Sequence, residues 1–231
     1  MKKLFQLALV LFIISCQTNP KHNTTISAKI KGFQKGTVYL QKFQDTAYVT
    51  LDLLVVKGKE VVEFDCHLEE PEMLYLSLSK AVDAERISFF ADAGTTTIDT
   101  RLKQFAMDAK IEGSQQQKLI EDYRKNLERF KNLHLDLLEA SLNSKRVGDK
   151  DKIDSIQNKM DKNLKRQYLY SINFAINNND SEVAPYIALS DVFDAKSSFL
   201  DSIYNSLTPR ISESKYGVIL KEYLEKINLK K

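Results

Sequence analysis

Residues 107–127 read MDAKIEGSQQQKLIEDYRKNL and contain the point at which the periodicity of the chain changes. Before Gly113, apolar residues alternate with polar ones, which is typical of half-buried strands. After Gly113, apolar residues recur at steps of three and four, as they do on one face of a helix. We therefore expect an α+β protein in which a β-rich domain over residues 24–112 precedes a helical domain over residues 113–231.

The β-rich domain consists of short apolar runs separated by glycine, proline and polar residues. Alternation over residues 26–30 and again over residues 49–53 predicts half-buried strands. About eight such runs occur before residue 113, and short strands with turns between them are typical of an antiparallel β-sandwich or an open barrel.

One turn and one cysteine in this domain lead to specific expectations. Lys57-Gly58-Lys59 follows an apolar run and predicts a hairpin turn to a return strand. On that strand Cys66 is in phase with Val62 and Phe64. We therefore interpret Cys66 as a small core side chain rather than a redox thiol.

The second domain predicts a helical bundle. Apolar residues recur at helical steps from Leu119 to Leu138 and from Ile153 to Ile176, which indicates two long amphipathic helices. Gly148 lies between them, so we expect a turn there and an antiparallel helix pair. Shorter helices are expected over residues 184–193, 199–207 and 214–227.

The N-terminus has the pattern of a signal for export. Lys2 and Lys3 precede an apolar run, residues 4–14, that is broken only by Gln6. Eleven helical residues reach about 16 Å, whereas a bilayer core is about 30 Å thick. Residues 1–15 therefore indicate a cleaved signal peptide rather than a permanent membrane span.

Ile13-Ile14-Ser15-Cys16 resembles the lipobox of bacterial lipoproteins. The resemblance implies that Cys16 is lipidated and anchors the mature chain in a membrane, because two or three acyl chains bind stably. The alternative is an ordinary secretory signal with an incidental cysteine. Residues 16–23 form a tether without acidic residues, which by the same resemblance favours an outer membrane, with the protein facing the periplasm.

Charge and cysteine content limit the functional classes. The whole chain has 34 basic and 31 acidic residues, and removal of Lys2 and Lys3 with the signal peptide leaves 32 against 31, a charge of +1. A nearly neutral chain lacks the clustered basic surface of nucleic-acid-binding proteins, so we expect no nucleic-acid partner. If Cys16 is lipidated, Cys66 is the only remaining thiol, which excludes an intramolecular disulfide.

Several short motifs together resemble a known family. They are Ile30-Lys31-Gly32, Gly36-Thr37-Val38-Tyr39-Leu40, Val55-Val56-Lys57-Gly58-Lys59, Pro71-Glu72-Met73-Leu74-Tyr75-Leu76, Ile111-Glu112-Gly113-Ser114, Asn179-Asp180-Ser181-Glu182-Val183-Ala184-Pro185-Tyr186-Ile187 and Ser214-Lys215-Tyr216-Gly217. The pattern is similar to DUF4369, the domain of unknown function that precedes a thioredoxin-like domain in lipoprotein disulfide reductases of Bacteroidetes. In that family a C-terminal Cys-x-x-Cys pair supplies the reactive thiolate.

This sequence departs from the family at that redox site. It has no Trp and only two cysteines, Cys16 and Cys66, which form no Cys-x-x-Cys pair. The chain reaches Lys231 where the family's redox domain begins. The resemblance therefore does not imply oxidoreductase activity, and we expect no catalytic residues.

Two other motifs suggest chemistry but have a simpler interpretation. Ser77-Leu78-Ser79-Lys80 has the Ser-x-x-Lys spacing of penicillin-binding enzymes, but the alternating leucines place it on a strand instead of a helix. Glu69-Glu70-Pro71-Glu72 could bind calcium, although acidic residues around a proline usually form a solvated turn.

The histidines and one basic cluster also have structural interpretations. His22, His67 and His134 are far apart and lack the spacing of zinc ligands, so we expect no metal or cofactor. His134 lies on an apolar helix stripe and is interpreted as a hydrogen-bonded core residue. The basic residues of the second long helix are interpreted as part of a solvent-facing surface; they are Lys162, Lys165 and Arg166.

The sequence therefore predicts a non-catalytic envelope lipoprotein that acts as a binding or scaffolding module. Its sandwich edge or helical surface is expected to dock a periplasmic protein or peptide. An alternative is an accessory or substrate-binding part of a thiol-disulfide oxidoreductase system whose redox domain is on another chain. A third possibility, an enzyme with Cys66 as nucleophile, requires that thiol to be exposed and activated.

Overall fold

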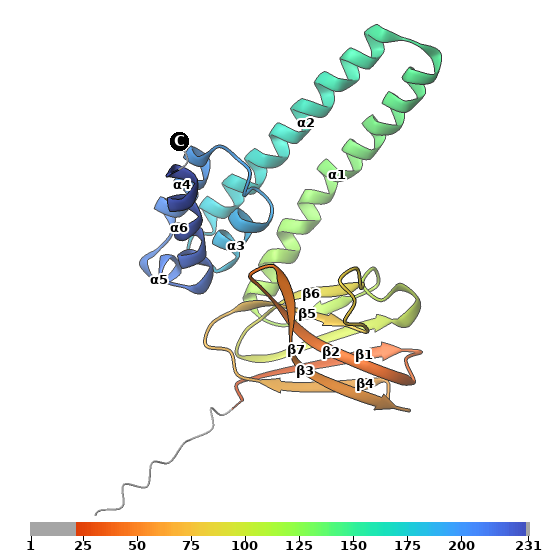
Figure 1. Cartoon of the computed structure of the whole chain (residues 1–231), viewed down its shortest axis with the longest axis vertical. Helices are drawn as coiled ribbons and strands as arrows, with labels where there is room; N and C mark the ends of the chain where they lie inside the picture. The colour runs from red at the N-terminus through yellow and green to blue at the C-terminus, as the bar shows by residue number, and fades with distance from the viewer. Residues whose placement is uncertain (1–21, 230–231) are drawn as a thin grey trace, which may run out of the picture.

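The computed structural model describes residues 22–229. Figure 1 shows a β-sandwich at one end, a long helical hairpin that extends away from it, and four short helices beside the base of that hairpin. The α+β class and the order of strands before helices are confirmed. The predicted signal peptide, residues 1–15, and the predicted lipidation site, Cys16, lie outside the described residues.

The sandwich contains two four-stranded sheets with the orders β4-β1-β7-β8 and β3-β2-β5-β6. All neighbouring strands are antiparallel except β1 and β7, which are parallel. Alternation of apolar residues is the same for both strand directions, so the sequence could not reveal the parallel pair. The strands are β1 (Thr24–Lys31), β2 (Lys35–Gln44), β3 (Ala47–Lys57), β4 (Val61–Cys66), β5 (Glu72–Ser77), β6 (Arg86–Ala91), β7 (Gly94–Arg101) and β8 (Lys110–Glu112), with a 3-10 turn at Leu102–Gln104.

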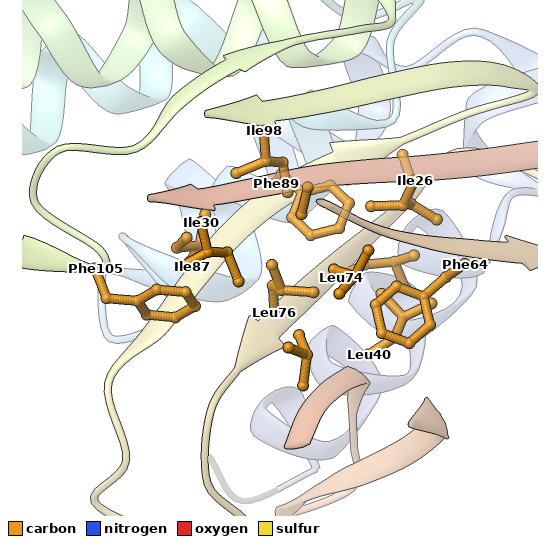
Figure 2. Packing of buried hydrophobic residues seen from close by; sticks show 14 of the residues in the cluster. Ile26, Ile30, Leu40, Phe64, Leu74, Leu76, Ile87, Phe89, Ile98 and Phe105 are labelled. Atoms are coloured by element: carbon orange, nitrogen blue, oxygen red, sulfur yellow. The ribbon is translucent and has the colours of Figure 1, made fainter. Parts of the chain in front are cut away.

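The two sheets enclose one apolar core. Ile26 and Ile30 of β1, which the alternation placed on one face, are fully buried there. Phe64 and Phe89 reach the same core from the two different sheets, as Figure 2 shows. The core is formed because each strand turns every second side chain inward.

The predicted hairpin at Lys57-Gly58-Lys59 is wrong. β3 and β4 belong to different sheets, and β4 pairs with β1 instead. The turn is held by the loop after β1 and by β1 itself. The Gly58 amide donates to the Gln34 carbonyl of that loop at 2.7 Å, and the Ile30 amide of β1 donates to the Glu60 carbonyl at 2.8 Å. A local turn pattern shows that the chain reverses, but it does not show which strand the chain joins next.

Strand β3 exposes the apolar residues that the sequence placed on a half-buried face. Val49, Leu51 and Leu53 are exposed, whereas Val56 is buried. β3 is an edge strand, and its register with β2 shifts opposite Leu40. A bulge of this kind changes which side chains of a strand face the core.

Helices α1 (Gln115–Val147) and α2 (Lys150–Asn177) form the predicted antiparallel pair. Ser114 caps α1 because its side chain accepts a hydrogen bond from the Gln117 amide. Gly148 ends α1 in the left-handed conformation, with φ 72°. Asp149 then caps α2, so the predicted turn is confirmed. Among the described residues, no helix combines the length and apolar character needed to cross a bilayer.

The remaining helices pack against the base of the hairpin (Figure 1). One of them, the single turn α5, was not predicted. It lies close to α6, where a Cβ atom at Gly217 would overlap the carbonyl oxygens of Ile211 and Ser212. Gly217 therefore permits the close approach of two backbones. The helices are α3 (Val183–Ser190), α4 (Ser197–Ser206), α5 (Pro209–Ser212) and α6 (Lys215–Asn228).

A second apolar cluster joins the sandwich to the helices. Met73 and Phe90 point outward from the sheet that contains β5 and β6 and are buried against Ile120, Val183 and Ile187 of the helical part. The open edge of β6 also hydrogen-bonds to α1, because the Phe90 backbone amide donates to the Gln117 side chain at 2.7 Å. The interface is therefore an apolar core with polar contacts, and we call it the junction.

Candidate binding cleft at the junction

A cleft of about 580 Å³ lies at one side of the junction. Its volume falls within the range of small-ligand and peptide-side-chain sites, and most of its walls are aromatic or aliphatic. The lining comes from the hairpin between β2 and β3, from β5, and from helices α3 and α6. The lining residues are Phe43, Asp45, Tyr48, Met73, Tyr75, Tyr186, Leu189, Ser190, Lys215, Tyr216, Ile219, Glu222 and Lys226.

The β2–β3 hairpin supplies one aromatic wall. Its two-residue turn begins at Asp45, which adopts a left-handed conformation with φ 56° that aspartate tolerates. The rings of Phe43 and Tyr48 pack edge to face across this hairpin, with their centres 5.1 Å apart. The ring of Tyr48 also packs edge to face on Tyr75, with a distance of 5.0 Å between the ring centres. The Arg86 guanidinium lies 3.7 Å from the centre of the Tyr48 ring. These contacts fix the ring of Tyr48 at the edge of the cleft.

The helices supply the opposite wall. Tyr186 of α3 and Tyr216 of α6 meet edge to face at 5.3 Å. Both rings also contact the ring of the buried Phe90. The distance between ring centres is 5.4 Å for Tyr186 and 6.0 Å for Tyr216. The Tyr216 hydroxyl accepts a hydrogen bond from the Met73 amide at 2.9 Å. The aromatic wall is therefore held by the sheet as well as by the helices.

Three of the cleft tyrosines, Tyr75, Tyr186 and Tyr216, have a raised pKa and keep neutral hydroxyls. Burial raises the pKa of Tyr75, and the neighbouring Tyr186 adds to the shift. Burial also raises the pKa of Tyr186 and of Tyr216. These hydroxyls therefore act as hydrogen-bonding groups without charge, and the charges of the cleft come from Asp45, Glu222 and the two lysines.

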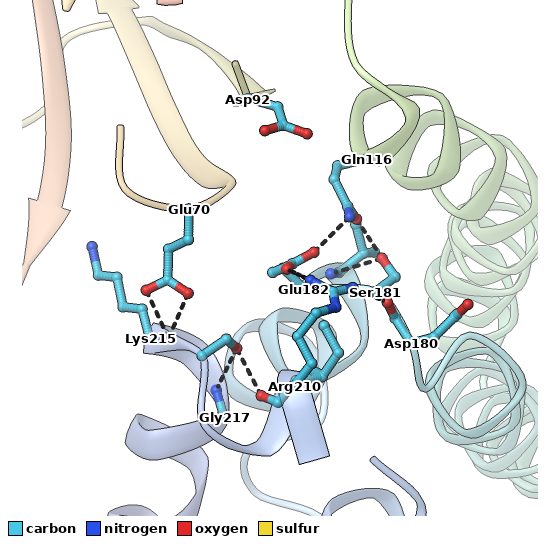
Figure 3. A network of polar contacts seen from close by, with 12 residues as sticks. Glu70, Asp92, Gln116, Asp180, Ser181, Glu182, Arg210, Lys215 and Gly217 are labelled. Atoms are coloured by element: carbon cyan, nitrogen blue, oxygen red, sulfur yellow. Dashed lines mark hydrogen bonds and ion pairs between the residues drawn. The ribbon is translucent and has the colours of Figure 1, made fainter. Parts of the chain in front are cut away.

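An acidic clamp, formed by Glu70 and Glu72, attaches the start of α6 to the sandwich at Lys215, which also lines the cleft. The Lys215 amide at the start of α6 donates to both carboxylate oxygens of Glu70, at 2.8 and 3.0 Å, as Figure 3 shows. The Lys215 ammonium forms an ion pair with Glu72. A carboxylate at a helix N-terminus satisfies free amides and interacts favourably with the helix dipole. The expected solvated turn at Glu69-Glu70-Pro71-Glu72 is therefore wrong for Glu70 and Glu72.

A second polar network, also visible in Figure 3, joins α1, α3 and α5. The buried Glu182 carboxylate forms an ion pair with Arg210. It also accepts a hydrogen bond from the side-chain nitrogen of Gln116, Nε2, at 2.6 Å. The Ser181 hydroxyl donates to the side-chain oxygen of Gln116, Oε1. The ion pair and the hydrogen bond offset the cost of removing the Glu182 carboxylate from water. The network therefore positions α3 beside the cleft.

A larger hollow, about 860 Å³, lies on the outer face of the β4-β1-β7-β8 sheet. Its walls are mostly charged and hydroxyl side chains from the strands, and Asp108, from the segment before β8, pairs there with Arg101. Its charges are mixed, with Lys29 and Lys110 close to Asp99. The cleft at the junction has the aromatic lining that this hollow lacks, so the cleft is the stronger candidate.

Cys66 packs against the sandwich core, as predicted for a small apolar side chain. Burial raises the pKa of its thiol to about 11, and the carboxylates of Asp65, Glu72 and Asp52 add to the shift. A high pKa disfavours the thiolate that nucleophilic chemistry needs. The environment therefore opposes the third hypothesis, in which Cys66 is a catalytic nucleophile.

Other residues singled out in the sequence lie apart from the cleft. Ser77 is buried at the end of β5 and its hydroxyl bonds to the carbonyls of Ser79 and Glu85, which agrees with the expected strand position. Lys80 lies over the ring of Tyr39. The basic residues Lys162, Lys165 and Arg166 are exposed, as expected.

The interpretation of one histidine is wrong. His134 is exposed, although its helical position predicted a core residue. His22 and His67 are exposed as well. Within residues 22–229, no group of three or more histidine, cysteine, aspartate or glutamate side chains is arranged to hold a metal ion.

The sequence did not identify the cleft itself. Its tyrosines come from β3, β5, α3 and α6, and they share no motif or spacing. One available signal was the resemblance, because Pro71-Glu72-Met73-Leu74-Tyr75-Leu76 and Ser214-Lys215-Tyr216-Gly217 contain residues of both walls. Without the fold, these two motifs could not be placed beside each other.

A family model described as domain of unknown function (DUF4369) matches residues 24–120, which confirms the resemblance to that domain over these residues. The match includes all eight strands and continues into α1 as far as Ile120. That extension agrees with the structure, because Gln117 and Ile120 pack onto the outer face of β6. Comparisons with curated proteins and with solved structures found no match.

Proposed function

Taking residues 24–120 as a DUF4369 domain, we propose that this protein is a non-catalytic lipoprotein of the cell envelope that binds a periplasmic protein or peptide in the cleft at the junction. Lipidation of Cys16, the outer-membrane location and the periplasmic orientation belong to this proposal and come from the sequence. The aromatic lining of the cleft is the observation that supports binding.

Tyrosine-rich surfaces suit protein and peptide ligands. A tyrosine offers a large, rigid contact area at a low cost in conformational entropy, and its hydroxyl can pair with a ligand backbone. Here Tyr48, Tyr75, Tyr186 and Tyr216 surround one cleft, and Leu189 and Ile219 add apolar area. A peptide side chain could enter the cleft while its backbone contacts the hydroxyls and the charged rim.

The test is a crosslinking experiment on the intact lipoprotein in its native envelope, followed by mass spectrometry that maps each crosslink to residues. Ile219 lines the cleft and is 40% exposed, so Ile219→Glu should block the site without harming the fold. Its neighbour Val218 is 43% exposed and does not line the cleft, so Val218→Glu is the matched control. We expect crosslinks at the cleft to disappear in the first variant and to remain in the second.

The identity of the crosslinked partner separates the proposal from its alternative. A thioredoxin-like protein at the cleft would place the chain in a thiol-disulfide oxidoreductase system as an accessory component. A partner that is retained equally by both variants would overturn the cleft as the binding site, and a glycan in place of a polypeptide would overturn the ligand class.

The non-catalytic part of the proposal has its own test. Because the pKa of the Cys66 thiol is raised from 9.0 to about 11, its thiolate fraction at pH 8 should be about 100-fold below that of an ordinary cysteine. Alkylation of the peptide that contains Cys66 should be slower by a similar factor in the folded protein than after unfolding. Rapid labelling in the folded protein would instead support a reactive thiol.

A further inference from the structure

Helix α1 carries two apolar stripes, and only the first is buried within residues 22–229. The first stripe faces α2 and includes Tyr123 and Leu127, together with the small buried side chains of Ser141 and Ser144. The second stripe, which we call the outer stripe, consists of Lys131, Leu135, Leu138, Leu142 and Lys145.

The outer stripe follows a heptad pattern. Its members are separated by four, three, four and three residues, so they share one face of the helix. Leu135, Leu138 and Leu142 are 61%, 41% and 52% exposed, although leucines at such positions normally face another helix. Figure 1 shows that this part of the hairpin extends beyond both the sandwich and the short helices.

A helix with two heptad stripes is typical of a bundle of three or more helices. In this hairpin, α2 occupies the first stripe, as the hydrogen bond from the Asn163 amide nitrogen to the Phe130 carbonyl at 2.9 Å shows. The outer stripe therefore has the pattern of a surface for one additional helix.

The charges at the ends of the outer stripe indicate which helix fits. Lys131 and Lys145 are fourteen residues apart, which corresponds to about 21 Å along α1. A second copy in antiparallel orientation, centred on Leu138, would place Lys131 against Lys145. A second copy in parallel register would place each lysine against itself. Both arrangements bring like charges together and are unfavourable.

We propose that the outer stripe binds an amphipathic helix of a different polypeptide, with acidic residues at the two ends of an apolar stripe. The partner helix completes a three-helix bundle with α1 and α2. Its leucine-type side chains cover Leu135, Leu138 and Leu142, and its acidic residues pair with Lys131 and Lys145. This surface is separate from the cleft at the junction.

The first test uses two synthetic helical peptides and the purified full chain in detergent. One peptide has three leucines on one face of the helix, separated by three and four residues as in the outer stripe. A glutamate occupies the next position of that face at each end, so the two glutamates are fourteen residues apart. The control peptide has lysines in place of these glutamates. Fluorescence anisotropy should show that the glutamate peptide binds about tenfold more tightly, with a difference that decreases at high salt.

Variants of the protein give the second test. The triple variant Leu135→Gln, Leu138→Gln and Leu142→Gln should abolish binding, whereas Leu133→Gln, also exposed but outside the stripe, should not. The double variant Lys131→Glu and Lys145→Glu should reverse the preference between the peptides. Thermal unfolding of each variant checks that the fold is retained, and Ile219→Glu in the cleft should leave peptide binding unchanged.

Three results would overturn the proposal. One is equal binding of both peptides, and another is the absence of binding by either. The third is a dimer of the full chain in sedimentation experiments that the triple leucine variant disrupts, because a second copy would then occupy the stripe.

Discussion

The base and the tip of helix α1 have similar amphipathic sequences but very different environments. At the base, Gln117, Ile120, Tyr123 and Leu127 are buried, because β6, α2 and α3 all contact this part of the helix. Toward the tip, the buried residues of α1 are the small polar Ser141 and Ser144. The same helix thus changes from a core element to a two-helix arm along its length.

This difference shows that helical periodicity predicts a helix without predicting how many of its faces are covered. At the base, Tyr123 stacks on Tyr170 at 5.6 Å, and its hydroxyl donates to Asp191 at 2.7 Å. At the tip, the faces of α1 that do not meet α2 carry exposed leucines. We expect the stability of the protein to depend on the base and its docking ability to depend on the tip.

The largest expected effect is at the junction. Phe90→Ala removes a fully buried ring that contacts Tyr186 and Tyr216, so it should lower the free energy of unfolding by about 4 kcal/mol. Urea denaturation followed by circular dichroism measures the change. A loss below about 1 kcal/mol would mean that the sandwich and the helices do not depend on this contact.

The next largest effect is expected at Glu182, whose buried carboxylate lies beside the base of α1. Glu182→Gln removes the charge that pairs with Arg210 and accepts from Gln116, so it should cost about 2 kcal/mol. The exposed Glu225→Gln on α6 is the control and should change stability by less than about 0.5 kcal/mol. Equal effects of the two substitutions in urea denaturation would contradict the structural role of the network.

A smaller effect of opposite sign is expected in the arm. Among the described residues, the side-chain oxygen of Asn163 is buried without a hydrogen-bond partner. Asn163→Leu removes this unpaired oxygen and also the hydrogen bond from the side-chain nitrogen to the Phe130 carbonyl. Because the leucine adds buried apolar surface in place of both, stability should rise by about 1 kcal/mol. Amide hydrogen exchange should slow in the distal halves of α1 and α2 more than at the base. Faster exchange there would show that the asparagine fixes the register of the pair.

The smallest effect is predicted for the outer stripe. Leu142→Gln changes an exposed residue of the arm, so the free energy of unfolding should change by less than about 0.5 kcal/mol. The comparison with Phe90→Ala tests the contrast directly, because both substitutions remove a large apolar side chain. A loss of 2 kcal/mol or more would mean that Leu142 is already covered in the isolated protein.

Much of the fold could be predicted because it follows from short-range patterns. Alternation located the strands, and the steps of three and four residues located α1 and α2, with Gly148 between them. The errors concern relations between elements. The turn at Gly58 reverses the chain but leads to the other sheet, and β3 exposes the face that carries Leu51 and Leu53.

The candidate site was beyond the reach of sequence patterns. Tyr48 and Tyr216 are 168 positions apart and line one cleft because α6 docks beside the β2–β3 hairpin. The acidic residues Glu70 and Glu72 appeared to form a solvated turn, yet they hold the start of α6. Neither relation has a local signal, since each requires the helices to be placed on the sheet.

By itself, the sequence determined the periodicity, and therefore the class and order of the elements, because backbone geometry fixes the repeat of side chains in strands and helices. It also determined the DUF4369 resemblance of residues 24–120. Only the tertiary structure decided the strand partners, the tyrosine cleft and the exposed face of α1, because these depend on which surfaces meet. Burial arises from contacts between distant segments, and a pattern within one segment does not contain that information.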